Sequence, residues 1–406
     1  MVKLWGEKEI KEAKVDKQLR DKVRADIEEK VEIGKPRFYS NNEQEFWYRI
    51  ENRVATADAI RRFCDAVGDV NPLYLNQDYA QNSIHGSIIA PPFFLCTVSQ
   101  FDWKGVWDMS EYGYKIAGFD AGAEVEWFKV IRVNDKFRVH EIATEVIDLT
   151  REDTALQFLV CADKVYTNQR DEIVAVVKTK VMKMIVDPNI KSQLAEPRLK
   201  YFSEDEVAEW FRLLQKEEIR GNNPRFWEDV NVGDQLPSTH HIFSLVESAA
   251  FEAVCGRIKS WRFEMTRFGS DSWRKMINPE SGLPDFGGPH LKDETARRYG
   301  SPRANCLAVQ MQAWLGHMIS NWMGDAGFLK RLICQVRKPL YRESLALCEG
   351  VVANKYTDGK EHLVDLNVSV ADHYGTLSIP KAMATVVLPS RCLRGADNSR
   401  LEPATP

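Results

Sequence analysis

Apolar and polar residues follow two kinds of pattern, and the two patterns occur in the same order in each half of the chain. Residues 57–67 form an amphipathic stretch that Thr56 would cap at its start and Gly68 would end, which predicts a short helix. Residues 121–184 instead alternate apolar with polar positions in long runs. They predict an antiparallel meander with a polar turn at residues 168–171.

The second half repeats this order. A strand and a turn are expected from Trp227, and residues 244–256 match the first capped helix in length and in the glycine that ends it. A second meander follows, with a hairpin turn at Asp358-Gly359 and last strands over residues 361–370 and 376–387. For this order of elements, a sheet with one face covered by a long central helix is the economical packing.

Two further helices are expected outside the repeat. Apolar residues recur at every fourth position from Val15 to Val31, which gives a helix with one apolar stripe that Gly34 and Pro36 would end. This stripe either contacts a partner or straps the helix onto its own domain, and the second interpretation is favoured. A capping box that begins at Ser203 opens the other helix, within a polar connection.

A chain of 406 residues is too long for one typical core, so two domains are expected. The repeat and its flanks divide the chain into an N-terminal amphipathic helix, a first domain, a linker with a helix, a second domain and a tail. The predicted boundaries are 1–36, 37–187, 188–225, 226–392 and 393–406.

Composition excludes several classes of function. The net charge of −4 argues against a nucleic-acid surface, which usually carries a strong basic excess. No apolar stretch approaches the roughly 20 residues of a membrane span, and no signal peptide is expected. The eight cysteines are scattered and never form Cys-x-x-Cys, so neither a disulfide framework nor a metal site is expected and a reducing cytoplasm fits best.

One motif occurs in both halves. The first copy is GDVNPLYLNQDYA at residues 68–80, and the second is DFGGPHLKDETA at residues 285–296. Each places an aspartate five residues before a position that is Tyr74 in the first copy and His290 in the second. A histidine after a Gly-Gly-Pro turn would ordinarily be solvated, but the aligned Asp285 and the repeat favour a catalytic role.

The first motif, followed by Ile89-Ala-Pro-Pro92, resembles the signature of the MaoC-like dehydratases, which include the R-specific enoyl-CoA hydratases. The family pattern is Gly-Asp-x-Asn-Pro-Leu-His-x-Asp-x-x-Tyr-Ala, and the second motif is similar to it more loosely. The resemblance covers roughly residues 40–390. It implies an α+β fold of two tandem hotdog domains, each a long central helix wrapped by an antiparallel sheet.

The resemblance also implies which copy is active. The family's catalytic aspartate and histidine fall on Asp285 and His290, whereas the first copy has Asp69 and Tyr74. A phenol with a pKa of about 10 cannot replace an imidazole with a pKa of about 6.5 as a base at neutral pH. The first copy is therefore expected to be degenerate and to lend shape to the acyl tunnel, with the second copy carrying the reaction.

The second copy departs from the family pattern at two places. Asn-Pro-Leu is replaced by Gly287-Gly288-Pro289, and the His-Gly pair that helps to form the family's oxyanion hole has no clear equivalent. Ala308 is the best match for that glycine, and its backbone N–H can still stabilise developing negative charge.

The activity implied by the resemblance is reversible addition of water to a 2-enoyl-CoA, with Asp285 and His290 activating the water and no metal or organic cofactor. The partner is then the acyl-CoA substrate, whose phosphates need cations. Arg303, Arg337 and Lys338 are candidates, together with Arg297 and Arg298. The oligomeric state stays open, and a homodimer is compatible with the sequence.

Two other functions remain as alternatives. A non-catalytic acyl-thioester-binding subunit is favoured by the Gly287-Gly288 departure, and a hotdog thioesterase is the third alternative. Residues 257–284 interrupt only the second copy and form either a lid over the site or a surface excursion. His317 lies in an apolar helical run and is interpreted as a core residue.

Overall fold

The computed structural model describes residues 17–39, 50–101, 115–151, 156–186, 197–258, 260, 277, 281–283, 288–298 and 301–393.

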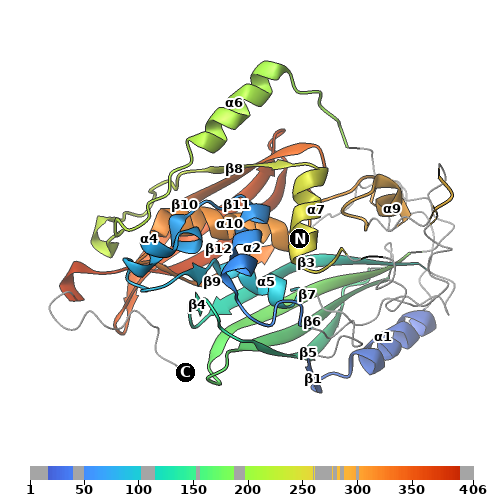
Figure 1. Ribbon diagram of the computed structural model, residues 1–406. Coiled ribbons are helices and arrows are strands. Elements are labelled where there is room, and N and C mark those ends of the chain that lie inside the picture. The colour runs from blue at the N-terminus through green and yellow to red at the C-terminus, as the bar shows by residue number, and fades with distance from the viewer. Residues whose placement is uncertain are drawn as a thin grey trace.

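One antiparallel sheet of ten strands runs through the described part of both halves, in the order β1-β5-β6-β7-β3-β9-β12-β11-β10-β8 (Figure 1). The strands are β1 (Pro36–Phe38), β3 (Lys115–Trp127), β5 (Arg138–Asp148), β6 (Leu156–Thr167), β7 (Ile173–Val186), β8 (Thr239–Phe243), β9 (Phe328–Gln335), β10 (Ser344–Asp358), β11 (Glu361–Asp372) and β12 (Leu377–Val387). A separate pair is formed by β2 (Ile89–Ala90) and β4 (Ile131–Arg132).

Most of the helices lie before the long strands of each half. They are α1 (Lys17–Val31), α2 (Ala57–Val67), α3 (Pro72–Leu75), α4 (Gln77–Gln81), α5 (Leu95–Val98), α6 (Glu204–Gln215), α7 (Leu245–Val254), α9 (Asp293–Arg298) and α10 (Ala308–Met323). Short 3₁₀ turns are η1 (Pro92–Phe94), η3 (Trp227–Asp229) and η5 (Arg391–Leu393).

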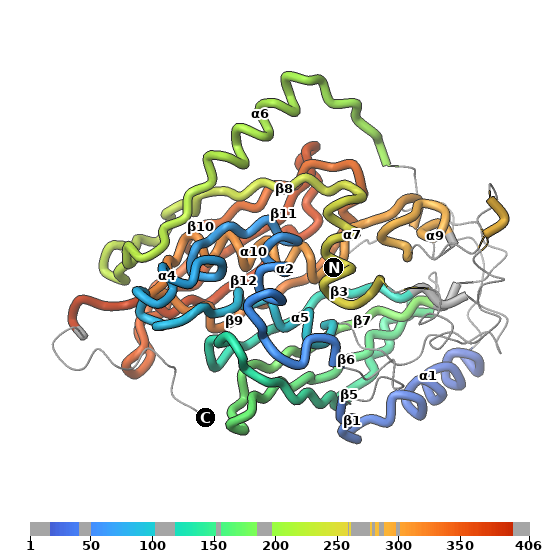
Figure 2. The backbone as a smooth tube through the Cα atoms, in the orientation of Figure 1, coloured from blue at the N-terminus to red at the C-terminus, as the bar shows by residue number. Residues whose placement is uncertain are grey.

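The two halves are related by an approximate two-fold axis through the middle of the sheet. There β3 pairs with β9 from Gly122↔Gln335 to Glu126↔Arg331, and the remaining strands follow outward in equivalent order. On the same axis α2 packs against α7, where Phe63 and Phe251 approach to 6.3 Å between ring centroids. Figure 2 shows the halves side by side, with the earlier strands in green and the later ones in orange and red.

Helix α10 forms the centre of the core, because all sixteen of its side chains are buried. It contacts β9, β10 and β11 of its own half and β3 of the other half. The corresponding segment of the first half begins with η1 and continues as the four residues of α5. The predicted α+β fold of two tandem hotdogs is confirmed.

Several local predictions are confirmed. The Thr56 side chain accepts from Ala59 N at the start of α2, and Gly68 ends that helix with φ +83°. The predicted capping box at Ser203 opens α6. The prediction of a strand at Trp227 is wrong, because residues 227–229 form η3, in which Trp227 Nε1 donates to Leu363 O.

Helix α1 is strapped onto its own half. Val23, Ile27 and Val31 are buried and pack with side chains of β5, β6 and β7. This is the favoured interpretation of the N-terminal stripe. In the described part of the chain, the helices are too short or too polar to cross a membrane.

Candidate functional site

His290 lies in the turn that precedes α9, and its ring is fixed from the side of α10. The Nδ1 atom is 2.7 Å from Asn305 O. A carbonyl oxygen can only accept, so Nδ1 carries the hydrogen and, in the neutral ring, Nε2 carries the lone pair. His290 therefore has the tautomer that a general base requires.

Helix α7 holds the backbone of the same turn. Ser248 Oγ donates to His290 O at 3.0 Å, and Leu291 N and Lys292 N both donate to Gly288 O. Ser248 is buried, because it lies on the face of α7 that is turned toward the second motif. The turn is thus held by α7 and by Asn305, which lies in the segment just before α10.

Ala308 is the first residue of α10, three positions after the carbonyl that His290 contacts. Its N-cap residue, Leu307, makes no side-chain hydrogen bond to the helix start. The first N–H groups of a helix have no partner within the helix and favour negative charge. The predicted oxyanion-binding residue and the predicted base are therefore close together.

The candidate cations fall into two groups. Arg303 Nε lies 3.3 Å from Asp293 Oδ2, and Arg342 lies 3.3 Å from the other oxygen of the same carboxylate. Arg342 also donates to Leu291 O. These two arginines anchor the start of α9, so Arg303 has a structural partner that the sequence did not indicate. Arg342 was not among the candidates at all.

The other candidate cations lie on the connection after β9. Lys338 is exposed, and Arg337 N donates to Ser378 O at 2.9 Å. This connection leads directly to Leu340, whose carbonyl accepts from Cys306 N at 2.7 Å. Arg337 and Lys338 are therefore close in sequence to the segment that lies alongside the start of α10. Arg297 is exposed on α9.

Asp285 lies outside the described residues, as does most of the 257–284 insertion. Among the described residues, no group of three His, Cys, Asp or Glu side chains could hold a metal ion.

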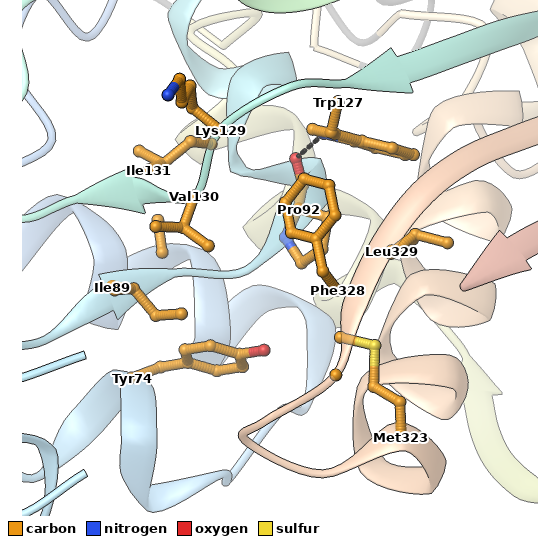
Figure 3. A pocket seen from close by; sticks show the side chains of 12 residues that line it. Tyr74, Ile89, Pro92, Trp127, Lys129, Val130, Ile131, Met323, Phe328 and Leu329 are labelled. Atoms are coloured by element: carbon orange, nitrogen blue, oxygen red, sulfur yellow. Dashed lines mark hydrogen bonds between the residues drawn. The ribbon is translucent and has the colours of Figure 1, made fainter. Parts of the chain in front are cut away.

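In the first half, the side chains of the equivalent Asp and Tyr are buried. Asp69 is 1% exposed and its Oδ1 accepts from Asn71 N at 3.0 Å, as expected for an aspartate that holds a turn. Tyr74 is 3% exposed and borders a small, mostly apolar cavity of about 30 Å³ (Figure 3). This space suits one or two water molecules, and an acyl thioester would not fit.

An imidazole nevertheless reaches this first motif from the other half. His317 on α10 places Nε2 2.6 Å from Glu217 Oε1 and 3.8 Å from Asp69 Oδ1. Burial lowers the pKa of His317, but the carboxylates of Asp69 and Glu217 outweigh burial and leave the pKa raised. Burial raises the pKa of Asp69 itself, and the nearby imidazole opposes that rise.

No partner of His317 is evident from the sequence, because Asp69 is 248 positions away and Glu217 belongs to the linker. The interpretation of His317 as a buried core residue holds for its burial. The contacts of His317 with the two carboxylates were not predicted, because only the packing of α10 against the first motif brings these groups together. His241 stacks on Trp314 with 4.6 Å between ring centroids and forms part of the same buried region.

Comparison with known proteins places the fold. Residues 45–177 match the family described as "FAS1-like, dehydratase domain region". A solved structure named "MaoC-like dehydratase" has 16% identity and a TM-score of 0.60, and the match covers 89% of this chain and 100% of that one. A putative MaoC domain protein dehydratase from Chloroflexus aurantiacus J-10-fl has 14% identity and a TM-score of 0.50 over 88% of this chain and 96% of its own.

The predicted resemblance to the MaoC-like dehydratases is confirmed by the family match and the shared fold. No curated protein matches this chain in sequence. The family match falls on the half that has Tyr74 in place of a histidine.

Proposed function

We propose that this chain, whose fold is that of the MaoC-like dehydratases, is a hydro-lyase that adds water reversibly to the C2=C3 bond of a 2-enoyl-CoA. The observation that carries the proposal is the placement of His290. Its Nδ1 is occupied by Asn305 O, and its ring is held next to the start of α10. A base next to the N–H donors at a helix start is what hydration of a thioester needs.

In this proposal His290 Nε2 accepts a proton from water as the water oxygen bonds to C3. The electron pair of the C2=C3 bond moves toward the thioester carbonyl, whose oxygen gains negative charge. The Ala308 N–H stabilises that charge at the positive end of α10. A proton is then delivered to C2, and Asp285, carried over from the family motif, shares this proton transfer with His290.

The phosphates of CoA are assigned to Arg337 and Lys338. Arg303, another of the candidates, is 11% exposed at its side chain and paired with Asp293. It is proposed to support the site by anchoring α9. Exposed cations are better suited to a ligand that arrives from solvent, because binding does not have to break an existing buried ion pair.

The test is a two-readout assay of the purified chain with 2-enoyl-CoA thioesters of several chain lengths. Hydration removes the enoyl absorbance and leaves the thioester intact. A thioesterase would instead release free CoA thiol and keep the enoyl absorbance. A binding subunit would show tight acyl-CoA binding with neither change, and that result would reject the proposal.

A further inference from the structure

A second ionisable side chain faces the turn that carries His290. Glu252 lies on α7, one helical turn after Ser248, and is only 3% exposed. Its carboxylate lies against Gly288: a Cβ atom built on that glycine would be 3.8 Å from Oε2 and 4.0 Å from Oε1. Glycine at position 288, one of the two departures from the family pattern, leaves this space beside the carboxylate.

The carboxylate of Glu252 is incompletely paired. Arg257 Nε lies 3.6 Å from Oε2, and Arg257 also donates to Gln100 Oε1 of the first half at 3.0 Å. Oε1 of Glu252 has no hydrogen-bond partner among the described residues. A buried carboxylate with an unpaired oxygen costs free energy of folding, so stability alone does not account for it.

The two-fold relation between the halves indicates what Glu252 faces. Counted from the N-caps Thr56 and Ser244, Glu252 occupies the position of Cys64 in the first half. There the carbonyl of Cys64 accepts from Asp69 N at 3.0 Å. Burial raises the pKa of the Cys64 thiol, and the Asp69 carboxylate raises it further. The Cys64 thiol also contributes to the raised pKa of Tyr74. This helix position therefore borders the motif in the first half, as Glu252 borders Gly288 in the second.

We propose that Glu252 is a positioning residue for His290: a buried carboxylate that stabilises the imidazolium formed when His290 takes the proton from water. This inference rests on the proposed hydration. The proton lost by water resides on Nε2 until it is delivered to C2. A negative charge held in a site of low dielectric acts on a nearby imidazolium far more strongly than it would in water.

Other charged groups also surround this turn. Asp293 is shared by two arginines, and the Glu51 carboxyl group lies against Gly256 at the end of α7. Charged residues around the turn include Glu51, Glu247, Arg257, Lys292, Asp293, Arg303 and Arg342.

The experiment compares Glu252→Gln with the wild type in the hydration assay across a range of pH. We expect kcat to fall about tenfold to a hundredfold with KM nearly unchanged, the size typical for groups that orient a histidine. The acid limb of the pH profile should move to lower pH, because losing the carboxylate makes the imidazolium easier to deprotonate. The thermal midpoint should stay the same or rise, since an incompletely paired buried charge is removed.

Two variants serve as controls. Glu247→Gln, on the same helix but bonded to Ser244, should keep wild-type kcat and pH profile. Glu252→Asp keeps the charge and should keep the position of the acid limb, so it tests the proposal even if Glu252→Gln folds poorly. Wild-type kcat and an unmoved limb in Glu252→Gln, with His290→Ala inactive, would overturn this inference alone. A wild type without hydration activity would overturn the proposed function itself.

Discussion

Tyr74 and His290 occupy equivalent positions in the two halves, yet their surroundings differ in kind. Burial raises the pKa of Tyr74, whose hydroxyl therefore stays protonated. His290 is only partly buried, and its Nδ1 atom is hydrogen-bonded to a carbonyl oxygen. The comparison of these two residues supports one working site in the second half and a filled site in the first.

The filled site has a charge arrangement of its own, centred on His317. We predict that His317→Gln lowers the free energy of unfolding by about 3–5 kcal/mol near pH 6, because two buried carboxylates lose their cation. The pKa of His317 is raised in the folded state. The stabilisation by His317 is therefore complete below a pH of about 6.5, the pKa of a histidine in the unfolded chain. It is lost as pH rises through the higher pKa that His317 has in the folded protein.

Denaturant unfolding of the wild type and of His317→Gln near pH 6 and at alkaline pH measures this difference. The difference in free energy of unfolding between the two proteins should become smaller at alkaline pH. His140→Gln is the control, since burial lowers the pKa of that histidine and no carboxylate raises it. A gap that stayed constant or grew with pH would contradict the assignment of an imidazolium between Glu217 and Asp69.

The two ends of helix α10 lie beside different sites of the molecule. The start of the helix lies beside His290, and its later turns carry His317 against the first motif. We predict that Ala308→Pro lowers kcat by about 10²–10³-fold while KM changes little, because it removes one N–H donor to the developing oxyanion.

Proline suits this position otherwise. It is the first residue of the helix, and Leu307 before it is already extended at φ −61° and ψ 136°. Ala308→Gly retains the N–H and should keep nearly full activity. Steady-state kinetics of both variants, with circular dichroism to verify folding, would check the prediction. Equal activity in the two variants would remove Ala308 from the oxyanion site.

The helices that frame the site were largely predictable from the sequence, because each carries its own local signals. Thr56, Gly68 and Ser203 mark helix ends through capping chemistry that acts within a few residues. Contacts such as Glu252 with Gly288 depend on how α7 is placed against a turn more than thirty residues later. Local patterns do not encode that placement, so Glu252 and Arg342 were not found from the sequence.

At the scale of the whole molecule, the join between β3 and β9 makes the two halves one sheet. Gly122 sits at this join with φ +124°, next to a register shift in β3. A Cβ atom there would lie 2.1 Å from the carbonyl oxygen of Cys334 on β9. The alternating pattern of β3 predicted a strand, but the close approach at this residue is visible only once the partner strand is known.

We predict that Gly122→Ala destabilises the protein by at least about 3 kcal/mol, since strain in the backbone adds to a clash between strands. Gly359→Ala is the control: it also has a positive φ, of +56°, but meets no atom within 4 Å. Thermal or denaturant unfolding of the two variants measures the difference. Equal losses would mean that the join tolerates a side chain.

The proposed hydration depends most on His290 acting as the base. The most direct measurement is the rate at which purified wild type and His290→Ala remove the enoyl absorbance of the same 2-enoyl-CoA, at saturating substrate and neutral pH. We predict hydration by the wild type and a loss of at least about 10²-fold in the variant, the usual contribution of a positioned proton-transfer group. Equal rates in the two proteins would show that His290 is not the base.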